Sequence, residues 1–126
     1  METSLALSII GGVLILVGVL FNAIPKVVNQ KVMGDLAEEA VNPAAALRTV
    51  IGGSAFAIGF IALFCRNLPV EQATTLLIAM AIGMIVVMST IILIKFRGFA
   101  DDIAVPPVIM FIILIAIALY GAGVVG

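Results

Sequence analysis

The sequence predicts an all-α integral membrane protein: an antiparallel four-transmembrane-helix bundle with a short interfacial helix between the first two spanning helices. Of its 126 residues, 64% are hydrophobic and 10% are charged, whereas soluble domains contain roughly 45–50% apolar and 25% charged residues. The charges fall between four apolar runs, and each run reaches or approaches the about 20 residues needed to cross a ~30 Å hydrocarbon core. We therefore expect a single membrane domain over residues 1–126, with helices at approximately 4–25, 43–65, 69–94 and 105–125.

The first run, from Ser4 to Ile24, is expected to be a retained helix rather than a signal peptide. It lacks both the basic segment and the small-residue cleavage site that a signal peptide requires. Pro25 and Lys26 are expected to end it, since Pro disfavours helical geometry in the residue before it and Lys prefers the headgroup region. In residues 27–41, apolar positions at near-helical spacing favour a short helix lying in the interface, with its charged side chains in water.

The second run follows Asn42 and Pro43, which are expected to cap a helix and to occupy its first turn. Arg48 lies about one and a half turns into this helix, so it is placed near the membrane boundary rather than at the midplane. No charge occurs from Thr49 to Cys65. This helix is therefore expected to pack against other helices, with Arg48 as its one charged side chain near the membrane boundary.

Glycines are expected where another helix backbone approaches closely, as packing in membranes favours. The candidate positions are Gly11, Gly18, Gly52, Gly59 and Gly83. Gly52 and Gly59 are seven residues apart and therefore share one helix stripe. Segments 10–18 and 51–59 also share an I-G-G start and a final Gly at an offset of 41 residues. This repeat would indicate two related helix pairs, and convergent packing needs explain it equally well.

The third run carries a methionine at every fourth position, namely Met80, Met84 and Met88. We expect this soft stripe to serve packing or a partner surface rather than a metal relay. Before the fourth run, Asp101 and Asp102 are expected to cap or complement the helix start.

The sequence lacks the residues that several classes of function require. With no His and one Cys, the chain has no ligand set for haem, zinc, copper or iron–sulfur sites, so no metal and no cofactor is predicted, with a bound lipid or quinone left open. A net charge of −1 offers no basic stripe for nucleic acid. Since no Asp or Glu lies within the four apolar runs, of which the third is Ala73–Ile94, there is no evident proton-coupling group.

Basic residues are distributed unequally between the two sides of the predicted bundle. Loops one and three share one side and collect Lys26, Lys31, Arg48, Lys95 and Arg97, against Arg66 alone on the other. The positive-inside rule therefore places these loops in the cytoplasm and both termini in the periplasm of a bacterial inner membrane.

The same cytoplasmic end holds the candidate site for a ligand or a lipid headgroup. Its residues are Asn22, Lys26, Arg48, Lys95, Asp101 and Asp102. Arg48 suits an anionic headgroup or a substrate carboxylate through its planar donors. The alternative is an arginine that extends to the interface or pairs with one of the two aspartates.

The segment NPAAALRTVIGG, Asn42–Gly53, resembles the L-R-x-x-x-G-G pattern of an uncharacterised bacterial family of small four-helix membrane proteins within the DoxX-like group. The first helix, which ends in Asn22-Ala-Ile-Pro25, is similar as well, so the likeness covers roughly the first half of the chain. The resemblance implies an antiparallel four-helix bundle in a bacterial inner membrane. Some DoxX-like proteins are associated with quinone-linked oxidation, whereas the most similar family has no assigned activity.

Two functions remain open. The first is a non-catalytic accessory or structural subunit whose helices pack in the lipid bilayer against other membrane protein subunits. The second is a DoxX-like quinone- or lipid-linked redox protein with a polar site around Arg48. The absence of ligand residues and mid-membrane charges favours the first.

Overall fold

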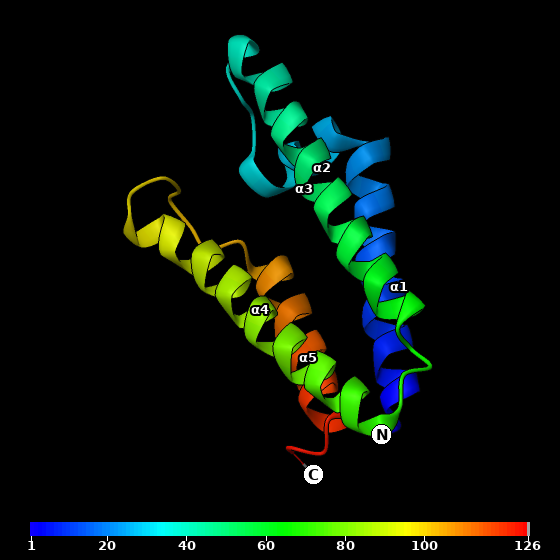
Figure 1. Ribbon diagram of the computed structural model, residues 1–126. Helices are drawn as coiled ribbons and strands as arrows, with labels where there is room; N and C mark the ends of the chain where they lie inside the picture. Colours follow the sequence, from blue (N-terminus) through cyan, green and yellow to red (C-terminus); the bar gives the residue numbers. More distant parts are fainter. Residues whose placement is uncertain (126) are drawn as a thin grey trace. The chain divides into compact units, whose positions relative to one another are not determined.

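The computed structural model describes residues 1–125, which contain five helices and no strand (Figure 1). The helices are α1 (Thr3–Ala23), α2 (Pro25–Met33), α3 (Glu38–Phe64), α4 (Val70–Phe96) and α5 (Val105–Gly121). They belong to two compact units. Residues 11–64 form the α1–α3 unit, and residues 1–10 with 65–125 form the α4–α5 unit. The all-α prediction is thus confirmed.

Three helices are long and apolar enough to cross a membrane. α1, α3 and α4 have 21, 27 and 27 residues, with mean hydropathies of 2.6, 1.8 and 2.8. α5 is apolar but has 17 residues, which at ~1.5 Å per residue gives roughly 26 Å, the lower end of what a span requires. By length and composition, the chain therefore fits the class of a helical membrane protein.

A proline and a glycine set the bounds of the short helix α2. The backbone leaves helical geometry at Ile24, with φ −137° and ψ 56°, and Pro25 opens α2, where its missing N–H costs nothing. Gly34 ends α2 at φ 75°, a left-handed conformation that favours glycine. A short helix therefore does lie between α1 and α3, over residues 25–33 rather than within 27–41.

The third helix begins earlier than the sequence predicts. α3 starts at Glu38, so Asn42 does not cap it and Pro43 lies inside the helix. Pro43 lacks the N–H that would donate to the carbonyl of Glu39, and its ring crowds that carbonyl, which costs about 3 kcal/mol in a helix interior. Glu38 and Glu39 occupy the first turn, where carboxylates complement the positive end of the helix dipole.

The core of the α1–α3 unit is a backbone contact built on glycines. A Cβ on Gly18 would lie 2.6 Å from the carbonyl oxygen of Gly52, and one on Gly59 would lie 2.7 Å from the carbonyl oxygen of Gly11. Since Gly11 meets Gly59 and Gly18 meets Gly52, the two segments run in opposite directions. α1 and α3 approach so closely that no side chain fits between them here.

The α4–α5 unit has a different core, made of small and medium-sized side chains. α4 buries Ala73, Leu77, Ala81 and Met84, and α5 buries Leu114, Ile115, Ala118 and Gly121. The start of α1 adds Ala6, Leu7 and Ile10, all fully buried. A Cβ on Gly121 would collide with the Cβ of Ala6. Small residues therefore permit close packing in this unit too, at positions that the sequence analysis did not single out.

Candidate functional site

The polar centre of the α1–α3 unit is a hydrogen bond between α2 and α3. The Nε of Arg48 donates to Oδ1 of Asn29 over 2.7 Å. The Arg48 guanidinium also lies over the ring of Phe21 in α1, with its central carbon 5.0 Å from the ring centroid. Such a cation–π contact contributes about 0.5–1 kcal/mol. Arg48 therefore connects all three helices of the unit through one half-buried side chain.

Asn29 is the buried polar residue of this centre and is only 2% exposed. Its Nδ2 has no hydrogen-bond partner among residues 1–125 and is shielded from solvent. A buried donor left unpaired costs about 1–3 kcal/mol. Arg48 itself keeps its two terminal nitrogens free of hydrogen bonds within the described chain, and neither is fully buried. The centre thus retains unused donors.

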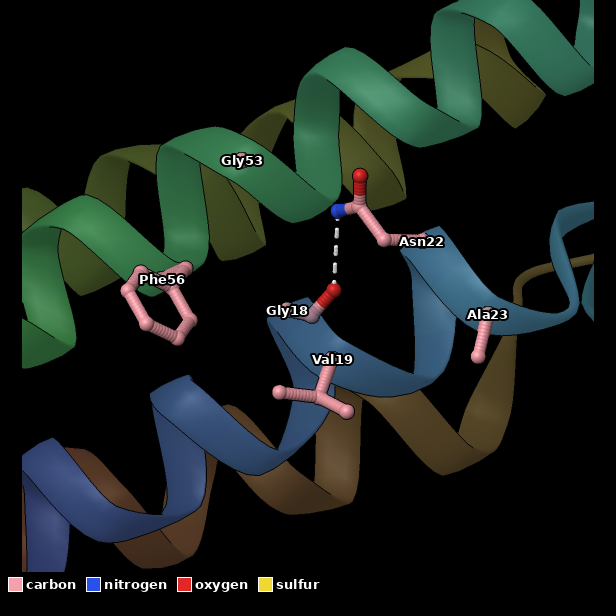
Figure 2. Close-up of a pocket in the computed structure, with 6 residues that line it drawn as sticks. All are labelled: Gly18, Val19, Asn22, Ala23, Gly53 and Phe56. Carbon is pink, nitrogen blue, oxygen red and sulfur yellow. Dashed lines mark hydrogen bonds between the residues drawn. The ribbon is translucent and has the colours of Figure 1, made fainter.

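Asn22 directly follows Phe21 in α1 and lies close to the glycine contact. Its Nδ2 donates to the carbonyl of Gly18 at 2.9 Å and to that of Thr49 at 3.4 Å. The second bond joins α1 to α3, which is the interhelical role expected for such an asparagine. Figure 2 shows the first bond at the edge of an open groove.

Two hollows flank these polar residues. The first is a groove of about 550 Å³ lined by Gly18, Val19, Asn22, Ala23, Gly53 and Phe56 (Figure 2). The second is a pocket of about 320 Å³ lined by Lys26, Asn29, Gln30, Gly34, Asp35, Leu36 and Val41. The groove is apolar apart from one amide, whereas the pocket combines a cation, a carboxylate and two amides.

The structure divides the predicted site residues between the two units. Asn22, Lys26 and Arg48 belong to the α1–α3 unit. Lys95 lies in the last turn of α4, while Asp101 and Asp102 lie in the segment before α5, and all three are exposed. The capping role predicted for Asp101 and Asp102 is wrong. α5 has Ala104 as its N-cap, with no side-chain hydrogen bond, because both carboxylates lie too early in the chain to reach the first turn.

The predicted glycine positions also have different surroundings. Gly11, Gly18, Gly52 and Gly59 form the close contact between α1 and α3. A Cβ on Gly83 would meet nothing within 4 Å. The packing role predicted for Gly83 therefore stays a prediction.

Asn29 is the residue that sequence reasoning missed. It precedes Val32 by three residues and Met33 by four and shares their helix face, yet both of those side chains are exposed while Asn29 is buried. Helical spacing therefore gave no signal for its burial. No group of three or more His, Cys, Asp or Glu suited to a metal occurs among residues 1–125.

Comparison of the chain with protein-family models, with curated proteins and with solved structures finds no match in any of the three. The DoxX-like resemblance therefore stays a prediction.

Proposed function

We propose that this chain is a non-catalytic accessory subunit of a larger membrane complex, folded as an antiparallel four-span bundle in a bacterial inner membrane. α5 is the fourth span in this proposal, at the short end of the permitted length. The support comes from surfaces of the spanning helices that remain uncovered within each unit.

The main observation is a set of open glycines within the spanning helices. A Cβ on Gly12, Gly53 or Gly83 would meet nothing within 4 Å. Glycine disfavours a helix by about 1 kcal/mol relative to alanine in water, and facing lipid gives nothing in return. Small residues are enriched where helices of membrane proteins touch. An open glycine on a spanning helix thus suits contact with a helix outside its own unit, and the proposal assigns that helix to another chain.

The burial of the spanning helices agrees with this proposal. Only 17% of the most apolar stretch of α3, and 17% of that of α4, is buried within the chain. Lipid covers such surfaces as well as protein does, so this exposure permits a partner without demanding one. The glycines carry the proposal.

The test is purification in a mild detergent at native expression level, with identification of stoichiometric partner chains. We expect Gly83→Leu to reduce partner recovery, because it fills the open surface. Ile85→Phe is the matched control: Ile85 is exposed and lies about 200° around the helix from Gly83 at ~100° per residue. Recovery of the wild-type chain alone, without a partner, would overturn the proposal.

A DoxX-like quinone-linked redox protein is the second candidate, supported by the groove in Figure 2. Its volume of about 550 Å³ falls within the roughly 300–1,000 Å³ of small-molecule sites. Phe56 offers an aromatic face to a ring, and the Oδ1 of Asn22 accepts no hydrogen bond within residues 1–125. A quinol hydroxyl has the donor that this oxygen lacks. Quinone that co-purifies with wild type but not with Asn22→Leu would favour this candidate, and its absence from both would remove it.

A further inference from the structure

Arg48 is a half-buried cation that has no counter-ion among residues 1–125. It belongs to α3, one of the candidate spans. Its two terminal nitrogens form no hydrogen bond within the described residues, and neither is fully buried. A charged side chain in a membrane segment is costly unless it is paired. Arg48 therefore calls for an anion from outside the described part of the chain.

Two contacts fix the direction from which that anion can approach. One edge of the guanidinium is used, because Nε donates to Oδ1 of Asn29 at 2.7 Å. One face is used as well, because the group lies over the ring of Phe21 at 5.0 Å. The Nδ2 of Asn29 is shielded from solvent, so this amide contacts the arginine and reaches no ligand itself. The free edge carries the two terminal nitrogens side by side.

The lengths of two helices place this free edge at the boundary of the hydrocarbon core. Arg48 directly precedes the uncharged stretch from Thr49 to Cys65, which has 17 residues. At ~1.5 Å per residue this stretch extends roughly 26 Å, close to the ~30 Å of the core. Phe21 gives the same depth independently, since it lies in the last turn of α1, a candidate span of 21 residues. Phosphate groups of lipids lie at this boundary.

We infer that Arg48 binds the phosphodiester group of a membrane lipid, with Asn29 as a positioning residue. Two parallel N–H donors on a planar guanidinium match two oxygens of one phosphate. The buried amide keeps its own nitrogen unpaired, because turning it over would oppose Nδ2 to the Nε–H of Arg48. The amide thus holds the arginine with its free edge available. Inorganic phosphate offers the same oxygens, so the experiment must separate it from the lipid.

The test measures lipid binding to the purified, delipidated chain by native mass spectrometry. The probes are phosphatidylglycerol and monogalactosyldiacylglycerol with identical acyl chains, of which the second has no phosphate. We expect one phosphatidylglycerol per chain, bound about tenfold more tightly than the galactolipid, which corresponds to about 1.4 kcal/mol. Equal binding of the two lipids would overturn the site. Displacement of phosphatidylglycerol by an equal concentration of inorganic phosphate would support an anion site and overturn its assignment to lipid.

Arg48→Gln removes the charge and keeps a side-chain amide that can donate to Asn29, so we expect the tenfold preference for phosphatidylglycerol to disappear. Arg97→Gln is the matched control. Arg97 also stacks on a phenylalanine, with its central carbon 4.8 Å from the ring centroid of Phe99, but its side chain is exposed and no buried amide holds it. This variant should keep the preference. An equal loss in both variants would refute the site.

Asn29→Asp tests the need for an external anion. The new carboxylate still accepts from the Nε of Arg48 and supplies a counter-ion within the chain, so the preference for phosphatidylglycerol should fall while helicity is unchanged. An undiminished preference would refute the inference, and this variant decides the question if Arg48→Gln fails to fold. Because the measurement needs no partner chain, its outcome is independent of the accessory-subunit proposal.

Discussion

Replacing Gly59 by alanine tests the closest helix contact in the α1–α3 unit. The new Cβ would lie 2.7 Å from the carbonyl oxygen of Gly11 and 2.9 Å from the backbone nitrogen of Ile15. Both are backbone atoms of a helix, so neither can rotate away as the end of a side chain does. Ordinary contact begins near 3.4 Å, so the two backbones must separate by about 0.7 Å.

The cost of that separation follows from the loss of packing. A radial gap of roughly 0.5–1 Å forfeits a quarter to a half of the dispersion energy of the contacts that it opens. Overpacking of this kind typically costs about 1–3 kcal/mol. In an open helical position, the same substitution would stabilise the helix by up to about 1 kcal/mol. We therefore expect Gly59→Ala to lower the free energy of unfolding by about 1–3 kcal/mol.

The measurement is equilibrium unfolding in mixed detergent micelles, followed by circular dichroism. Gly53→Ala is the matched control on the same helix, because a Cβ there meets nothing within 4 Å, and we expect no loss of stability. Equal stability of the two variants would refute the close contact between α1 and α3.

Two further predictions concern the polar end of the α1–α3 unit. Arg48→Leu should destabilise the chain by about 2–4 kcal/mol, since it removes a charged hydrogen bond and a cation–π contact and leaves the buried Asn29 amide without partners. Adding Asn29→Leu should restore most of the lost free energy of unfolding in the same assay. If it does not, the unpaired Asn29 amide is not the cause of the destabilisation. For orientation, in a Cys65→Ser background, a cysteine at Glu38 should resist a membrane-impermeant reagent added to intact cells while one at Glu2 reacts. The reverse labelling pattern would place the Arg48 end outside.

Periodicity made part of the fold predictable from the sequence. Apolar runs of membrane length mark helices whatever packs around them, and three of them appear as candidate spans. The spacing between Gly52 and Gly59 places both on one stripe, and both face α1 in the structure. These features depend on regular repetition along one helix, which a sequence displays directly.

Local boundary signals were less informative. Asn42 and Pro43 have the residue types of a helix start, yet α3 begins at Glu38 and contains both. Asp101 and Asp102 have the right chemistry to cap α5 but lie too early in the chain. Capping depends on a register of single residues, and composition does not determine that register.

The hydrogen-bond partner of Arg48 could not be predicted from the sequence, for a related reason. The sequence placed Arg48 near the membrane boundary and suggested an anion or an aspartate as its partner, whereas the structure pairs it with the neutral amide of Asn29. Asn29 lies on a nine-residue helix, too short for periodicity to establish which face is buried. The pairing exists only because α2 folds back against α3.

The glycine contact between α1 and α3 relates the two halves of the unit by an approximate two-fold axis. Gly18 meets Gly52 and the backbone of Phe56, just as Gly59 meets Gly11 and the backbone of Ile15. In the shared numbering of the repeat, each of these residues is the counterpart of one in the other segment. Each segment therefore contacts the other through the same equivalent positions.

For helices that cross a membrane in opposite directions, such an axis lies in the membrane plane, as in inverted-topology repeats. The same relation makes Leu63, which faces Gly11, the counterpart of Asn22, which faces Gly52. The two ends of the contact therefore share one backbone geometry and differ in chemistry. One end is closed by a leucine, and the other by an asparagine that begins the polar region leading to Arg48. The difference in polarity between the two ends of the contact therefore comes from the side chains of Leu63 and Asn22, because the backbone geometry is nearly the same at both ends.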